Sequence, residues 1–258
     1  MSFWHAVLNP VPIMQNLIAS VIWILFAMLV AFRAYRYGKK VHPVRIHVRK
    51  VTGPELTRTR PLILIATVSP YQRRTAEHLT DAEFAAALSA GDLDKLPLSP
   101  TTPSIGQIVL VLDTYRGSLN EIFLITTMSE GLSSLDSVPL LRNHALRSNP
   151  NLVVHAGPEY SVSLNEDNQV AESAHRVATR IFERLRKEKR YVPDESRILV
   201  DVTGGPRSMQ IGVLLACLRP EQDVHVVGMK YDKSTGDPDY ASAFPMVIHF
   251  EPDLRISR

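Results

Sequence analysis

Apolar residues gather in one long run near the N-terminus and then in a series of short runs separated by polar turns. The long run covers residues 11–32, which contain no charged residue. A helix of this length would measure about 33 Å, which matches the hydrocarbon core of a bilayer. The pattern therefore predicts one transmembrane α-helix within an N-terminal segment, residues 1–37.

Beyond residue 60, short apolar runs typical of strands alternate with segments that have the spacing of a helix. Continuous apolar runs, typical of strands buried on both faces, occupy 61–68, 105–114, 121–127, 152–157, 197–205, 223–231 and 245–250. Helices are predicted at about 74–90, between 127 and 151, at 169–190 and at 208–218. This alternation predicts an α/β fold with a Rossmann-like, mainly parallel sheet over residues 61–258.

A basic linker, residues 38–60, joins the two parts, and the alternation at 44–51 fits an added edge strand. Residues 33–50 hold seven of the 29 basic residues and no acidic one, which leaves 22 basic against 26 acidic residues elsewhere. Such a balance argues against a spread basic face, so we expect no direct DNA binding. The basic flank predicts a cytoplasmic C-terminal domain, a short external N-terminus and a location in the cell inner membrane.

Two other interpretations of the apolar run are a cleaved signal peptide and a buried core helix. A signal peptide carries its basic residues before the run, whereas here they follow it. A core helix alternates polar and apolar faces, whereas this run is nearly apolar all round. Small and polar residues fall near one face of the predicted helix, namely Asn16, Ser20, Ala27 and Ala31. Both an inert anchor and a self-associating helix that lines a pore fit these residues.

Polar residues at two predicted strand ends are candidates for ligand contacts, because α/β sheets bind ligands at the carboxyl ends of their strands. The first end is 67–71 and the second is 201–209. In the second, Gly204 and Gly205 allow a tight turn, and Pro206 suits a first helical turn. With Thr203, Arg207 and Ser208 the free amides of that turn would form an anion site. A plain strand–turn–helix connector is the alternative; the pattern is neither a Walker A loop nor a GxGxxG fingerprint.

The segment 201–209, DVTGGPRSM, resembles the DxTGG[TS]KxM signature of CARF domains, the CRISPR-associated Rossmann-like sensors, and 66–71 resembles their other ligand loop. The resemblance implies a dimer that binds a cyclic oligoadenylate across its two-fold axis. It also implies that Asp201 orders the loop. This sequence differs at Pro206, where the family has Thr or Ser, and at Arg207, where it has Lys. The implied ligand-binding residues are Thr67, Ser69, Thr203, Gly204, Gly205, Arg207 and Ser208.

No metal-ligand cluster, cofactor motif or catalytic residue is evident in the sequence. The combination of a predicted membrane helix and a CARF-like domain resembles the membrane-anchored CARF proteins of type III CRISPR systems. That resemblance implies an antiviral effector in which a cyclic oligoadenylate, first of all cyclic tetra-adenylate, gates a membrane pore formed by a homodimer or higher homo-oligomer such as a tetramer. Depolarisation and growth arrest would follow. A membrane-anchored ring nuclease and a tethered adaptor without a pore remain alternatives, and a dinucleotide-binding enzyme ranks last because the first strand lacks a glycine fingerprint.

Overall fold

The computed structural model describes residues 44–50, 61–73, 78–130, 133–165, 169–188, 198–217, 223–231, 234 and 238–252. Residues 45–251 form one compact unit. The predicted membrane helix at 11–32 lies outside the described ranges, as do Asn16, Ser20, Ala27 and Ala31. Within those ranges, no helix combines the length and the hydrophobicity needed to cross a bilayer.

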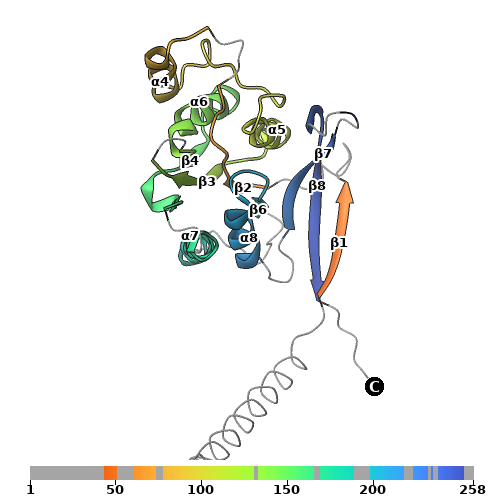
Figure 1. The fold of residues 1–258 in the computed structure, drawn as a ribbon. Helices are drawn as coiled ribbons and strands as arrows, with labels where there is room; N and C mark the ends of the chain where they lie inside the picture. Colours follow the sequence, from red (N-terminus) through yellow and green to blue (C-terminus); the bar gives the residue numbers. More distant parts are fainter. Residues whose placement is uncertain are drawn as a thin grey trace, which may run out of the picture. The chain divides into compact units, whose positions relative to one another are not determined.

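Eight strands form the sheet at the centre of this unit, in the order β1-β8-β7-β6-β2-β3-β4, with β5 paired to β3 (Figure 1). Five pairs are parallel, and β7 and β8 are antiparallel. The fold is therefore a mixed α/β architecture with a mostly parallel, Rossmann-like sheet, as predicted. The strands are β1 (Val44–Lys50), β2 (Ile63–Thr67), β3 (Glu121–Met128), β4 (Val153–His155), β5 (Ser161–Ser163), β6 (Ile198–Asp201), β7 (Asp223–Tyr231) and β8 (Pro238–Pro252).

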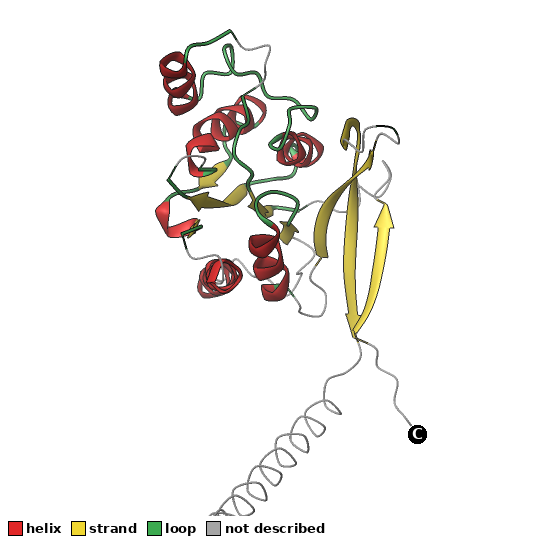
Figure 2. Cartoon of the chain, viewed as in Figure 1, coloured by secondary structure: helices red, strands yellow, loops and turns green. Residues whose placement is uncertain are grey.

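Helices cover both faces of the part of the sheet that contains β2, β3 and β6 (Figure 2). One face carries α4 (Asp81–Ala90), α5 (Gly106–Tyr115) and α6 (Val138–Ser148), and the other carries α7 (Val170–Lys187) and α8 (Arg207–Ala216). Two short 3-10 turns, η1 (Leu135–Ser137) and η2 (Pro158–Tyr160), complete the described elements. Helices can pack on both faces because successive side chains of a strand point to opposite faces of the sheet.

Strand β2 shows how that period divides the core. Leu64 and Ala66 join the apolar cluster under α4, α5 and α6, while Ile63 and Ile65 join the cluster under α7 and α8. All four side chains are buried. A run that is apolar at every position is therefore required here, because both faces of the strand lie against helices.

The prediction of a strand at 105–114 is wrong: this segment forms helix α5. Its buried residues include Ile105, Ile108, Val109 and Leu112, which recur at the three- and four-residue spacing of a helix face. Val111 is also buried, so the apolar face is wide and the run reads as continuous. A continuous apolar run fits a buried strand and a buried helix equally well, and its ten residues favour the helix on length alone.

Helix α4 begins at Asp81, not near residue 74 as predicted. Thr80 and Glu83 form a capping box, in which the Thr80 hydroxyl accepts from the Glu83 amide and the Glu83 carboxylate accepts from the Thr80 amide. The other predicted helices are confirmed at α6 and α7, each within narrower bounds, and at α8, which begins one residue earlier and ends two residues earlier than predicted. The edge strand suggested by the alternation at 44–51 is present as β1.

The order in which the chain adds strands to the sheet reverses at β2. The chain passes from β2 to β3 and β4 on one side, and then returns to place β6 and β7 on the other. Strands β2 and β6 are adjacent and parallel, with Ala66 opposite Asp201. The loops that leave these two strands therefore diverge at one edge of the sheet, which is the position where open α/β sheets bind ligands.

Candidate anion-binding site

Two loops meet beyond the carboxyl ends of β2 and β6, and both were selected from the sequence. The Gly205 amide donates a hydrogen bond to the Ser69 hydroxyl oxygen at 2.8 Å, although the two residues are 136 positions apart. Ser69 belongs to the loop after β2 and Gly205 to the loop after β6. The pairing turns the two loops into a single surface at the switch point of the sheet.

Glycine is required at both positions of the turn. A Cβ atom on Gly204 would lie 2.3 Å from the carbonyl oxygen of Thr67, so only a residue without a side chain allows this approach of the two backbones. Gly205 has a φ of 76°, in the left-handed region, and a Cβ atom there would meet the side chain of Met209. The turn thus brings the chain directly into helix α8.

The amide group of Gln210 closes the turn from the helix side. Its Nε2 atom donates to the carbonyl oxygens of Thr203 and Gly205, each at 3.0 Å. The hydrogen-bonding capacity of these carbonyl groups is therefore used by Gln210. The amides of the first turn of α8, in contrast, receive no side-chain cap. Uncapped amides at a helix N-terminus carry partial positive charge, which favours an anion.

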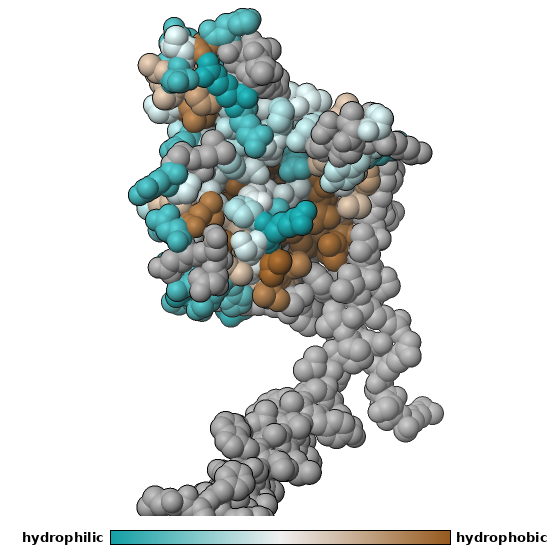
Figure 3. Space-filling model, in the orientation of Figure 1, coloured by the Kyte–Doolittle hydropathy of each residue, from teal (hydrophilic) through white to brown (hydrophobic). Residues whose placement is uncertain are grey.

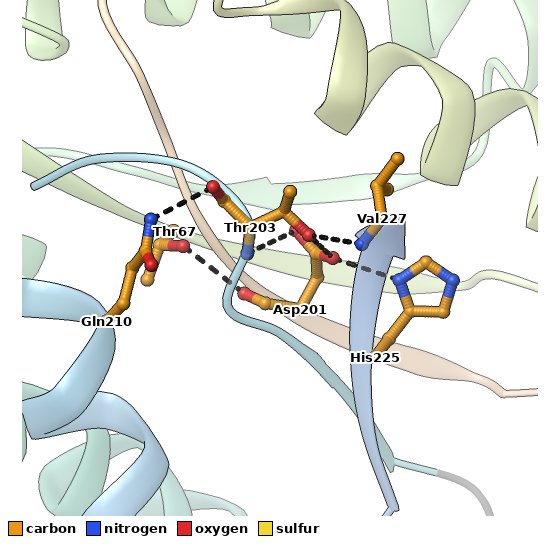
Figure 4. A network of polar contacts seen from close by, with 6 residues as sticks. All are labelled: Thr67, Asp201, Thr203, Gln210, His225 and Val227. Carbon is orange, nitrogen blue, oxygen red and sulfur yellow. Dashed lines mark hydrogen bonds and ion pairs between the residues drawn. The ribbon is translucent and has the colours of Figure 1, made fainter. Parts of the chain in front are cut away.

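A buried network stabilises the loop from below (Figure 4). The Thr203 hydroxyl donates to Asp201 Oδ1 at 2.7 Å and accepts from the amide of Val227 at 2.9 Å. Asp201 Oδ1 also lies 2.9 Å from Nδ1 of His225. The Thr67 hydroxyl, fully buried, lies 3.4 Å from the carbonyl oxygen of Asp201. The hydroxyls of Thr67 and Thr203 thus make contacts inside the protein.

Three of the predicted residues carry side-chain donors outside the buried network. Arg207 is exposed, and Ser69 and Ser208 are half-buried. One guanidinium, two hydroxyls and the amides at the start of α8 form a set of donors suited to phosphate oxygens. The predicted residues therefore divide by what they supply. Ser69, Arg207 and Ser208 supply side-chain donors, whereas Gly204 and Gly205 form the turn. The hydroxyls of Thr67 and Thr203 are engaged in the contacts below it.

Two residues of this site were not selected from the sequence. Gln210 lies one helical turn beyond Pro206. It contributes to the site only because its side chain points back toward the glycine turn and binds the carbonyl groups there. His225 lies in β7, where the parallel register sets it opposite Asp201. A histidine flanked by valines in the predicted strand, VHVV, was the one available signal for it.

A cavity of about 660 Å³ lies elsewhere, between α7 and the ends of β3 and β5. Arg176, Arg180 and Glu183 line it together with hydroxyl residues, and all three of these charged side chains are exposed. Because the lining carries both signs of charge on one solvated helix face, we assign the site to the paired loops instead. Among the described residues, no group of three or more His, Cys, Asp or Glu side chains is placed to hold a metal ion.

Comparison with family models and with curated proteins gives no match. Among solved structures, one that matches is Enterococcus italicus Csm6 bound to cyclic hexa-2'-fluoro-hexa-dAMP. The identity is 13%, the match covers 69% of this chain and 36% of that chain, and the TM-score is 0.36. This chain therefore corresponds to about a third of the length of that protein.

Proposed function

We propose that this protein is a membrane-anchored sensor of type III CRISPR defence, which binds a cyclic oligoadenylate between two copies of the chain. The observation that carries the proposal is the hydrogen bond between the Gly205 amide and Ser69, with Arg207 exposed beside it. It unites the two loops that resemble the ligand loops of CARF domains. Cyclic tetra-adenylate is the first candidate ligand, since its symmetric ring suits a two-fold site.

The chemistry of the surface fits a ligand with several phosphates. In the described part of the two loops, one copy offers Arg207 and one helix N-terminus, which is a small site for a polyanion. Two copies related by a two-fold axis would double each donor and could grip phosphates on opposite sides of a ring. A ring that contacts both subunits would bind best when they are correctly placed, and this provides the differential affinity that a sensor needs.

An apolar stripe on α8 supports pairing with a second copy. Ile211 and Leu215 are 53% and 52% exposed, although both are large hydrophobic residues. They follow Arg207 at intervals of four, so all three lie along one face of the helix. Figure 3 shows hydrophobic surface over α8 and between α8 and β7. A second copy packed on this stripe would bring two Arg207 side chains to the same site.

The sheet offers a route from the ligand loop toward the N-terminal segment. Thr203 is bonded to β7 through the Val227 amide, and β7 pairs with β8, where Val227 lies opposite Pro245. Strand β8 is in turn the neighbour of β1, which directly follows residues 1–43 in the chain. A shift of the loop on ligand binding would therefore reach the first residues of the linker through the Thr203 hydroxyl and the pairing of the strands.

The output, in this proposal, is a change in the packing of the apolar helices formed by residues 11–32 in the cell inner membrane. Asn16, Ser20, Ala27 and Ala31 would lie at the helix–helix contact, and opening of a pore would depolarise the cell. An adaptor role predicts that a poly-leucine helix of equal length retains function, whereas a pore role predicts that it does not.

Isothermal titration of the full-length protein in detergent with cyclic tri-, tetra- and hexa-adenylate tests the proposal. We expect one ring size to bind with one ligand per two chains. The recovered ligand, analysed by mass spectrometry, distinguishes a sensor, which returns it intact, from a ring nuclease, which cleaves it. Failure of every ring to bind would overturn the proposal.

A further inference from the structure

Asp201 and His225 form a fully buried pair beneath the ligand loop. They lie opposite each other in the parallel register of β6 and β7, and both side chains have no solvent exposure. Nδ1 of His225 is 2.9 Å from Oδ1 of Asp201. Buried polar groups of this kind destabilise a fold unless their hydrogen bonds are made, so the pair constrains how the end of β6 lies against the first residues of β7.

The same carboxylate oxygen also binds Thr203, the residue just before the two glycines of the turn. Asp201 Oδ1 accepts from the Thr203 hydroxyl at 2.7 Å, and this hydroxyl in turn accepts from the Val227 amide. Asp201, Thr203, Val227 and His225 thus form a closed set of contacts that joins the loop to β7 (Figure 4). If the imidazole were lost, Asp201 could rotate, and Thr203 would lose the acceptor that orients it.

Only one nitrogen of the imidazole takes part. Because a carboxylate accepts and does not donate, Nδ1 carries the hydrogen atom of the His225–Asp201 bond. Nε2 is buried and has no hydrogen-bond partner among the described residues. The imidazole and the ring of Tyr115 meet edge-on, at 6.0 Å between centroids. The contribution of His225 to the loop therefore comes from a single donor at the Nδ1 position.

We propose that His225 is a positioning residue for the anion-binding loop, which fixes Thr203 through Asp201 and so sets the direction of the Gly205 amide and the first turn of α8. The ligand of that loop rests on the proposed function above, but the positioning does not. His225 touches no ligand in this arrangement. A purely structural role would lower the stability of the whole domain, whereas a positioning role loosens the loop selectively.

The test compares two variants of the full-length protein. His225→Asn keeps an N–H donor close to the Nδ1 position, and His225→Leu keeps a comparable apolar volume without a donor. Hydrogen exchange is measured at the amides of Gly205 and Val227, which report the loop, and at Leu64 and Leu124, which report the buried strands. Affinity for cyclic tetra-adenylate is measured in parallel.

We expect His225→Leu to speed exchange at Gly205 and Val227 by about tenfold, with Leu64 and Leu124 unchanged, because an unsatisfied buried acceptor costs roughly that factor. Affinity for the ring should fall by about the same factor, and His225→Asn should restore both. Unchanged loop exchange in His225→Leu, or equal acceleration at all four amides, would overturn the proposal.

Two further outcomes are also decisive. If His225→Leu does not fold, His225→Gln replaces it, because glutamine places its donor near Nε2 and should loosen the loop where asparagine does not. Equal behaviour of the Asn and Gln variants would then refute the assignment of Nδ1. If the wild-type protein binds no ring, the proposed function fails, while the exchange rates at Gly205 and Val227 still decide the role of His225.

Discussion

Gly204 approaches the backbone of Thr67 so closely that a Cβ atom on the glycine would lie 2.3 Å from the Thr67 carbonyl oxygen. Thr67 ends β2, and Gly204 begins the turn after β6. The two strand ends are therefore held together by backbone packing as well as by the bond between Ser69 and Gly205. Any side chain at Gly204 must push the two loops apart.

Gly204→Ala should consequently reduce stability by about 1–3 kcal/mol, because the backbone itself has to shift. Urea unfolding of the full-length protein measures this change. Gly117→Ala is the matched control, since a Cβ atom on Gly117 has no heavy atom within 4 Å. Equal stability of the two variants would show that the close approach of the loops is absent in solution.

Thr203→Val tests the buried network under the loop. The substitution keeps the shape of the side chain but removes a hydroxyl that makes two hydrogen bonds, to Asp201 and from Val227. The Val227 amide would then lack its partner, at a cost of about 1–3 kcal/mol in unfolding free energy. Thr203→Ser, which keeps the hydroxyl, should lose much less. Similar losses in both variants would mean that the methyl group matters more than the hydrogen bonds.

Ile211→Glu combined with Leu215→Glu should prevent pairing of the chain. Charged residues on the α8 stripe would have to be desolvated in a dimer interface, which strongly disfavours association. Light scattering of the detergent-solubilised protein gives the oligomeric state. Val153→Glu is the control, because Val153 is 50% exposed but lies on β4, the last strand of the sheet on the side away from β7 and β8. A dimer that survives the double substitution would place the interface elsewhere.

The capping box of α4 should respond to pH. The pKa of Glu83 lies below its ordinary value of 4.5, chiefly because the Thr80 backbone amide donates to the carboxylate, with the Thr80 hydroxyl second. A lowered folded-state pKa means that the stabilisation is complete above the unfolded value and is lost as the pH falls through the folded one.

Hydrogen exchange of the α4 amides in Glu83→Gln and in wild type measures this contribution. The variant should exchange faster at neutral pH, and the difference should disappear in acid as the wild-type carboxylate takes up its proton. A difference that is constant across the pH range would mean that charge plays no part in the cap.

The parallel core of the fold could be predicted from the sequence because β2, β3 and β6 are buried on both faces. Their runs, such as ILIAT and EIFLITTM, are apolar or β-branched at nearly every position. Helix α7 was equally clear, since Val170, Ala174, Val177 and Ile181 repeat at helical spacing beside charged residues. In these elements the local pattern and the tertiary environment agree.

Helix α5 could not be predicted in this way, because it is buried over a wide face and its sequence lacks the polar stripe that distinguishes a helix from a buried strand. Strand β5 was also missed. Its three residues, Ser161–Ser163, pair with the end of β3, and the pairing includes a bond between the hydroxyls of Thr126 and Ser161 at 2.6 Å. So short a polar segment carries no periodic signal.

The two loops of the candidate site were recognisable because glycine, proline and hydroxyl residues follow strands directly. The pair of Asp201 and His225 was not, since it depends on which strand lies next to β6 and in what register. Likewise, Thr67 and Thr203 were expected to line the ligand site, and nothing in the sequence indicated that their hydroxyls make contacts inside the protein. Residue types indicate a site, but the register of the sheet decides which atoms remain accessible.

Titration of cyclic tetra-adenylate into Arg207→Glu and Arg116→Glu, beside wild type, tests most directly whether the paired loops form the ligand site. Both arginines are exposed, but Arg207 begins α8 at the site, whereas Arg116 follows α5 and precedes β3 at the opposite edge of the sheet. We expect wild type and Arg116→Glu to bind one ligand per two chains, and Arg207→Glu to lose at least about a hundredfold in affinity. Equal affinity of the two charge-reversed variants would contradict the assignment of this site.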